Sequence, residues 1–99
     1  YNITAWNEIS NRDIVEKILK IMGKSPELIE FVPDRPGHDK HYSINSSKIK
    51  NEINWTPKFN FDDALQETVN WYIENNSWWE PLIDEKTLHP QPWTLNWNN

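Results

Sequence analysis

A short loop near the middle of the chain carries residues suited to binding phosphate. The loop consists of Asp34, Arg35, Pro36, Gly37 and His38. A planar guanidinium can make two parallel charge-assisted hydrogen bonds to phosphate oxygens, and the flanking prolines stiffen the backbone that carries it. Gly37 lets the backbone approach a ligand closely, and His38 can donate a further hydrogen bond. These residue types predict a diphosphate-binding loop.

Each candidate contact also has an ordinary structural explanation. Arg35 could pair with Asp34 or Asp39 on the surface instead of binding a ligand. Asn11 lies at the start of a predicted helix, where unpaired backbone N–H groups and the helix dipole favour an anion. Its amide could equally serve as a helix cap, so the residue types alone leave both interpretations open.

Metal and cofactor motifs are absent from the sequence. Three histidines, His38, His41 and His89, raise the question of zinc, for which imidazole is a frequent ligand. Two of them lie in the proline-rich loop and the third lies far away in the tail, so we predict no metal site. With only two glycines, the chain is not a self-contained dinucleotide-binding fold.

The first half of the chain predicts strands on either side of a helix. Residues 1–4 have the β-branched and aromatic content of a strand. Apolar residues then recur at helical spacing through residues 14–22, after a capping residue at Ser10 and before Gly23, which suits a left-handed helix end. A second apolar run, at residues 28–32, predicts another strand.

The second half predicts two more helices and a tail. Asn45 or Ser46 can cap a short helix, and Asn60 can cap a longer one that ends near residues 75–77. Residues 80–99 contain three prolines and two tryptophans without a sustained period, which indicates an extended arm. We therefore divide the chain into a subdomain at 1–79 and a tail at 80–99.

The composition fits one small soluble domain. The chain has 99 residues, of which 36% are hydrophobic and 25% charged, and a net charge of −5. That charge argues against a nucleic-acid surface, which needs clustered Lys and Arg. No apolar run approaches the roughly 18 to 20 residues that cross a bilayer, and the N-terminus has no secretory signal. We expect no membrane or nucleic-acid partner and a cytoplasmic location. Because the first residue is Tyr1 rather than Met, we also expect a piece of a longer protein.

Several short motifs occur in a characteristic order. They are Tyr1-Asn2-Ile3, Asn7-Glu8, Asn11, Asp34 to Asp39, Tyr42, Ser47-Lys48-Ile49, Trp55-Thr56-Pro57, Phe61, Glu67 to Tyr72 and Trp78-Trp79. In this order they resemble the C-terminal region of the dTDP-glucose 4,6-dehydratases, in the NAD-dependent epimerase/dehydratase family of extended short-chain dehydrogenases. The resemblance covers residues 1–79, and the R-P-G-H-D loop combined with S-K-I and W-x-P is its most specific part.

The resemblance implies an α/β fold, namely a small C-terminal substrate-binding subdomain without the Rossmann domain. The residues it implies as contacts to the nucleoside diphosphate are Asn11, Asp34, Arg35, Pro36, Gly37 and His38. It also implies that NAD, bound by the other domain, oxidises the sugar at C4 before water is lost across C5 and C6 and hydride returns to C6. The catalytic residues belong upstream, so we expect the fragment alone to be inactive and the full-length enzyme to be a homodimer.

Departures from the family pattern leave the specificity open. Thr4-Ala5-Trp6 stands where the family has Gly-Gly-His, Lys40-His41 replaces an arginine pair, and Asn45 replaces an aspartate. A UDP-glucuronate decarboxylase or a UDP-galactose 4-epimerase shares the implied fold and cofactor. From another class of protein, the chain could be a non-catalytic sugar-binding or interaction module that uses its tryptophans. These tryptophans could equally pack in the core or at an interface.

Overall fold

The computed structural model describes residues 1–96. Its elements are the α-helices α1 (Asn11–Ile21), α2 (Ser47–Ile53), α3 (Phe61–Glu74) and α4 (Asn76–Trp79), and the 3-10 helices η1 (Pro26–Leu28), η2 (Glu80–Leu82) and η3 (Pro92–Thr94). No helix among these residues is long and apolar enough to cross a membrane.

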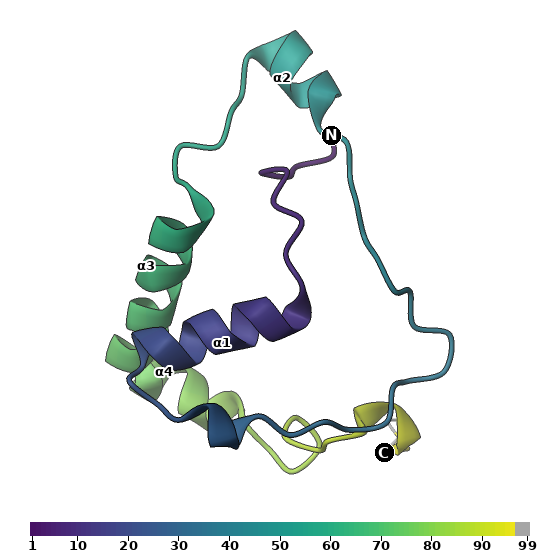
Figure 1. The fold of residues 1–99 in the computed structure, drawn as a ribbon, viewed down its shortest axis with the longest axis vertical. Helices are drawn as coiled ribbons and strands as arrows, with labels where there is room; N and C mark the ends of the chain where they lie inside the picture. The colour runs from purple at the N-terminus through teal and green to yellow at the C-terminus, as the bar shows by residue number, and fades with distance from the viewer. Residues whose placement is uncertain (97–99) are drawn as a thin grey trace.

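The helices lie around an open frame rather than a closed core. Helix α1 crosses α3, while α2 stands at the far end beside the N-terminus, and a long irregular segment runs from η1 back to α2 (Figure 1). The radius of gyration is 16.9 Å, whereas a compact domain of this length has a value of about 13 Å. The frame therefore leaves much of each helix uncovered.

Helix α1 has the predicted ends. Ser10 Oγ accepts a hydrogen bond from the Asp13 N–H at 3.1 Å, which supplies one of the helix's unpaired donors with a partner. At the other end Gly23 has a φ of +63°, and the Lys24 N–H donates to the Leu19 carbonyl at 2.9 Å. This left-handed glycine turns the chain away from the helix axis, as the sequence predicted.

Helix α3 begins and ends where the sequence predicted. Asn60 Oδ1 accepts from the Asp63 N–H at 2.9 Å, and the helix closes at Asn75, whose backbone N–H donates to the Trp71 carbonyl. The helix packs against α1, where Lys17 Nζ lies 2.6 Å from Asp62 Oδ1. Because this ion pair is largely exposed, it contributes little to the stability of the crossing.

Removing the Asn60 cap should lower the stability of α3 by about 1 kcal/mol, because the backbone N–H of Asp63 would lose the oxygen that accepts its hydrogen bond. A peptide of residues 58–79 carrying Asn60→Ala should show less helix by circular dichroism than the parent peptide. Asn60→Ser keeps an acceptor oxygen and should retain most of the helix. Equal helix content in the parent and alanine peptides would contradict this role.

The sequence left Asn45 and Ser46 as alternative caps of α2, and the side-chain hydrogen bond comes from Asn45. Asn45 Oδ1 accepts from the Ser47 N–H at 2.8 Å, whereas Ser46 makes no side-chain cap bond. Ser46 is instead fully buried, and its hydroxyl donates to the Thr4 carbonyl at 3.2 Å. Ser46 thus ties the N-terminal segment to α2, while Asn45 caps the helix.

The two predicted strands are not found among residues 1–96, so the predicted α/β class is not confirmed. Residues 1–4 contain no strand pairing, and both Tyr1 and Ile3 are 64% exposed. In the second run, Leu28 ends η1, because Ser25 caps the Glu27 N–H and Pro26 fixes the first turn. A β-rich sequence forms a strand only beside a partner strand, and neither run has one here.

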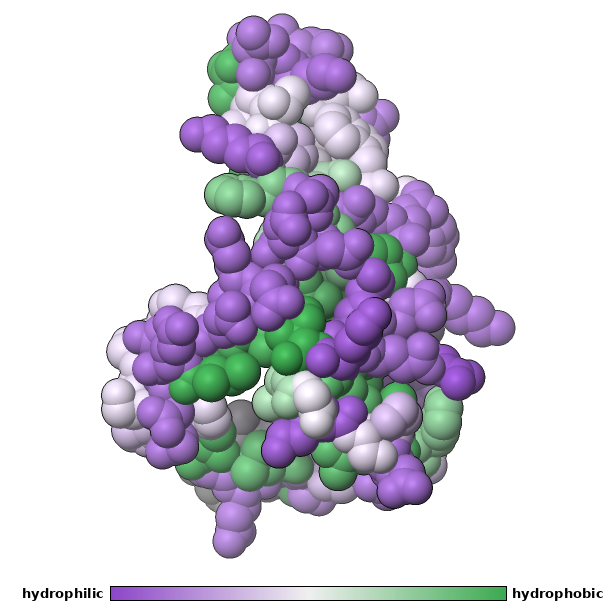
Figure 2. All heavy atoms as spheres, turned by 60° about the vertical axis from the view of Figure 1, so that its left-hand side comes forward, coloured by the Kyte–Doolittle hydropathy of each residue, from purple (hydrophilic) through white to green (hydrophobic). Residues whose placement is uncertain are grey.

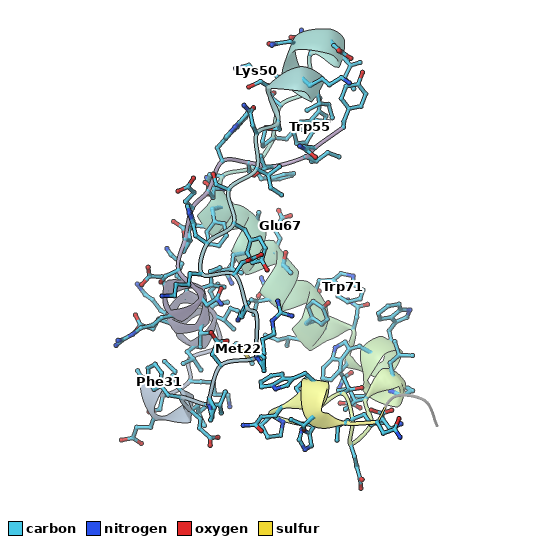
Figure 3. All side chains as sticks on the ribbon, turned by 90° about the vertical axis from the view of Figure 1, so that its right-hand side faces the viewer. Met22, Phe31, Lys50, Trp55, Glu67 and Trp71 are labelled. Atoms are coloured by element: carbon cyan, nitrogen blue, oxygen red, sulfur yellow. The ribbon has the colours of Figure 1, made fainter. Side chains whose placement is uncertain are left out.

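Few apolar side chains are buried. Ile49 and Val69 are the core residues, with 5% and 8% exposure, among the residues described. Figure 2 shows green apolar side chains open to view between purple polar ones in the lower half of the molecule. Phe31 and Trp71 lie on opposite sides of the molecule and are 80% and 43% exposed (Figure 3). The apolar surface is thus spread over more than one face.

In the described part of the tail, residues 80–96, the chain forms short turns. It contains η2 and η3, joined by a turn in which Asp84 Oδ1 accepts from the Thr87 N–H at 2.7 Å. Ahead of it, Trp79 Nε1 donates to the Tyr72 carbonyl at 2.7 Å, which anchors α4 on the end of α3. Trp97, one of the two tail tryptophans, lies outside the described residues.

Candidate functional site

The predicted phosphate loop forms a tight turn. The His38 N–H donates to the Arg35 carbonyl at 3.4 Å, with Pro36 and Gly37 at the two central positions. Gly37 has a φ of +69°, the left-handed value that the third residue of a type II turn requires. Proline and glycine are the residues that favour these two positions, so the sequence itself dictates the turn.

Asp34 closes this turn from within. Its Oδ1 accepts the Arg35 N–H at 2.8 Å and lies 2.7 Å from His38 Nδ1. The hydrogen bond from His38 is the main reason that the pKa of Asp34 is lowered. Asp34 was predicted as a ligand contact, and the geometry gives it the further task of fixing the loop.

The Asp34 contact also constrains what His38 can do. A neutral imidazole has one N–H, and the contact through Nδ1 occupies it. Donation to a phosphate through Nε2 then requires the imidazolium form. His38 is half-buried, so its ring is held while one edge stays accessible.

Arg35 does not form the surface ion pair that was the alternative to ligand binding. Its guanidinium forms no ion pair with any carboxylate among residues 1–96, and Asp34 contacts His38 instead. Arg35 is the first residue of the turn, and it is exposed. Its two parallel donor groups are therefore available for an anion.

A cleft of about 900 Å³ opens beside the loop. It is lined by Asn7, Glu8, Ile9, Ser10, Asn11, Asp34, His38, Asp39, Lys40, His41 and Tyr42. Asn11 is therefore brought onto one cleft with Asp34 and His38, although it lies more than 20 positions before them in the sequence. Arg35, Pro36 and Gly37 lie in the adjoining turn and do not line it.

Helix α1 begins at this cleft. Ser10 Oγ partners the Asp13 N–H, so the side chain of Asn11 is not needed as the cap, which was its alternative role. The first N–H groups of the helix and the positive end of its dipole lie at the cleft wall. This arrangement suits an anion next to Asn11.

Glu8 and His41 also line the cleft, and the sequence analysis did not single them out as ligand contacts. Glu8 Oε1 accepts from Ser43 Oγ at 2.6 Å, and Oε2 lies 3.3 Å from His41 Nε2. The hydrogen bond from Ser43 is the largest cause of the lowered pKa of Glu8. The Asn7-Glu8 motif could have pointed to Glu8, but no spacing rule pairs Glu8 with Ser43, which lies 35 positions away.

The turn before Asn7 is strained where the family pattern has glycines nearby. Trp6 has a φ of +55°, and its N–H donates to Thr4 Oγ1 at 3.2 Å. Lys50 Nζ lies 6.0 Å from the centre of the Trp6 ring. A left-handed conformation is unusual for a bulky residue, so these contacts hold a turn that the sequence itself does not favour.

The charge distribution of the cleft is mixed. Two carboxylates on its walls have histidine partners, Glu8 with His41 and Asp34 with His38. Lys40 lines the cleft without an ion-pair partner among residues 1–96. No group of three His, Asp or Glu side chains in that part of the chain could hold a metal ion.

Acid titration should separate the two histidine–carboxylate pairs. Since its pKa is lowered, Asp34 should stabilise the loop above its ordinary pKa of 3.8, and this stabilisation should be lost as pH falls through the lower folded value. Carboxyl-carbon NMR should show the depressed midpoint, and His38→Ala should raise it. His41→Ala should leave the Asp34 midpoint unchanged because His41 contacts Glu8. An Asp34 midpoint insensitive to His38→Ala would contradict the pairing.

Known proteins match this chain in both sequence and structure. The family model described as GDP-mannose 4,6 dehydratase matches residues 1–68. A dTDP-glucose 4,6-dehydratase of Streptomyces niveus is 45% identical over 92 residues, covering 91% of this chain and 27% of its own length. The dTDP-glucose 4,6-dehydratase of Escherichia coli is 37% identical over 95 residues, covering 85% of this chain and 26% of that protein.

A solved structure has the same arrangement of elements. The dTDP-glucose 4,6-dehydratase of Bacillus anthracis str. Ames, solved in complex with NAD, is 49% identical with a TM-score of 0.75. The match covers 84% of this chain and 26% of that one. The chain thus spans about a quarter of the length of the relatives it matches. Because the family model covers more than half of the residues, the chain belongs to the GDP-mannose 4,6-dehydratase family, and within it resembles the dTDP-glucose 4,6-dehydratases.

Proposed function

We propose that this chain is the nucleotide-sugar-binding part of a dTDP-glucose 4,6-dehydratase, and that it holds the substrate's diphosphate. The observation that carries the proposal is the type II turn, which presents an unpaired Arg35 guanidinium beside the cleft that contains Asn11. The relatives named dTDP-glucose 4,6-dehydratase support the choice of enzyme.

The proposed contacts divide into two groups. Arg35 clamps the phosphates, and Asn11 and His38 add hydrogen bonds from the cleft. Pro36 and Gly37 shape the turn, and Asp34 fixes it through His38. Residues 1–79 would form the substrate-binding subdomain, with 80–99 as its tail.

The chemistry belongs to the rest of the enzyme. NAD would accept and return the hydride during conversion of the hexose to the 4-keto-6-deoxy sugar. Gly23 ends a helix and Gly37 shapes the loop turn, so this chain has no glycine-rich loop to hold a dinucleotide. We propose that residues outside the chain bind NAD and carry out catalysis, and that the enzyme acts as a cytoplasmic homodimer, as the resemblance implies.

Substrate turnover by the full-length enzyme tests the proposal. The purified protein with NAD should convert dTDP-glucose to the 4-keto-6-deoxy sugar, which mass spectrometry detects as the loss of one water. UDP-glucuronate, UDP-galactose and GDP-mannose serve as competing substrates. Preferred turnover of one of these would replace the proposed substrate, while binding of free oligosaccharide without any nucleotide would favour a sugar-binding module.

A further inference from the structure

The carboxylate of Glu8 joins two segments that are far apart in the sequence. One oxygen accepts the Ser43 hydroxyl and the other lies beside the His41 imidazole, at 2.6 Å and 3.3 Å. Both partners come from the segment that follows the phosphate loop, whereas Glu8 comes from the segment that leads into α1. The carboxylate therefore bridges the two walls of the cleft.

This bridge lies between two hollows. Glu8 and Tyr42 line both the large cleft and a smaller cavity of about 120 Å³, which Trp6 and Ile44 also line. Asn11 begins α1 three residues after Glu8, and His38 ends the loop turn three residues before His41. The bridge is thus the part of the wall that lies next to both groups of proposed ligand contacts.

No other side-chain bond takes over this connection. Among residues 1–96, Glu8 makes the only side-chain hydrogen bond and the only ion pair between residues 7–12 and residues 34–43. The next side-chain hydrogen bond along these two segments is that of the Ser46 hydroxyl to the carbonyl of Thr4, a residue that lines the smaller cavity. Without Glu8, the remaining side-chain links between the N-terminal segment and the part of the chain after the loop would run from residues 1–6 to residues 46–52.

We propose that Glu8 is a positioning residue, which holds the phosphate loop and the N-terminus of α1 at the separation that the diphosphate spans. The proposal rests on the proposed function of the cleft. Glu8 acts through Ser43 and His41 on residues that contact the substrate's diphosphate and not on the reacting carbons of the sugar. Its loss therefore weakens substrate binding and leaves the chemical step unchanged.

Steady-state kinetics of the full-length enzyme test this separation of effects. Glu8→Ala should raise KM for dTDP-glucose about fivefold to twentyfold, with kcat within about twofold of the parent. Glu8→Gln keeps an acceptor for Ser43 and should recover most of the affinity. Glu16→Ala is the matched control, because Glu16 is an exposed carboxylate on α1 that pairs with Arg12 and does not line the cleft.

A double variant tests whether Glu8 acts through its partner. Ser43→Ala should raise KM in the same direction, and Glu8→Ala with Ser43→Ala should be no worse than Glu8→Ala alone. An unchanged KM in Glu8→Ala, a fall in kcat without a change in KM, or additive losses in the double variant would each overturn the proposal.

A distance measurement separates failure of the bridge from failure of the proposed function. The chain has no cysteine, so nitroxide labels can be placed on cysteines at Lys20 and Lys40 in a full-length protein freed of other cysteines. Double electron–electron resonance should give a narrow distance distribution in the parent and a broad one in Glu8→Ala. Turnover is measured on the unlabelled proteins, because Lys40 lines the cleft. Broadening together with no turnover of dTDP-glucose by the unlabelled parent would uphold the bridge and reject the enzyme assignment. Turnover with identical distributions would reject the bridge alone.

Discussion

Replacing Arg35 with alanine should weaken dTDP-glucose binding by the full-length enzyme about tenfold to one hundredfold. The change removes a bidentate contact to a charged group, for which a loss of about 1.5 to 3 kcal/mol is expected. Isothermal titration calorimetry with the parent and the variant measures the difference directly. Arg35→Lys keeps the charge without the two parallel donors, so it should fall between them.

The structure gives this prediction a matched control. Arg12 is the only other arginine in the sequence, and it is exposed on α1 and pairs with Glu16 at 2.9 Å. Arg12→Ala removes the same side chain outside the cleft lining and should change dTDP-glucose affinity by less than about twofold. If Arg35→Ala bound the substrate as tightly as the parent, Arg35 would not be the clamp.

The ordinary alternative for Arg35 would have predicted no such loss. Had Arg35 been paired with Asp34 or Asp39, its removal would chiefly have freed a surface carboxylate. Asp34 instead uses its oxygen to hold the Arg35 N–H and the His38 ring. The carboxylate thus organises the backbone under the guanidinium and leaves the guanidinium available.

Local chemistry explains which parts of the structure could be predicted from the sequence. The Ser10 and Asn60 caps, the Gly23 helix end and the Pro36-Gly37 turn each depend on residues within a few positions of one another. For these elements, side-chain type determines which backbone hydrogen bond is available. Their positions were therefore predictable without knowledge of the rest of the fold.

Contacts between distant segments were not predictable in this way. The Glu8 bridge depends on how the segment after the loop returns beside the N-terminal segment. The strands predicted at 1–4 and 28–32 failed for a related reason, since strand formation depends on a neighbouring strand that these residues do not provide. Sequence periodicity describes the segment but not what lies next to it.

The exposed apolar surface leads to a prediction about the 99-residue polypeptide made on its own. It should show no cooperative thermal unfolding. Burial of Ile49 and Val69 is far too little to offset the conformational entropy lost when the chain is ordered, and large side chains such as Phe31, Leu28 and Trp78 remain 63% to 80% exposed. The helices α1 and α3 are also short enough to be marginal in isolation.

Differential scanning calorimetry distinguishes the two outcomes clearly. A cooperative domain of this size absorbs about 60 to 80 kcal/mol at its midpoint, whereas the isolated polypeptide should give a sloping baseline without a peak. Circular dichroism should show partial helix that declines gradually with temperature. A single sharp transition of that enthalpy would show that the chain forms its own core, contrary to this prediction.

The same residues within a full-length dehydratase provide the control. The 49% identical relative has this arrangement with a TM-score of 0.75 while the matched region makes up 26% of its chain, so the open frame is compatible with a larger protein packed around it. In the full-length protein, Val69→Ala should lower the midpoint of the cooperative transition, because it removes methyl groups from a buried side chain and leaves a cavity in their place. In the isolated polypeptide we expect no cooperative unfolding transition, so the same substitution should change no midpoint. A measurable shift there would mean that α1 and α3 form a cooperative core without the rest of the enzyme.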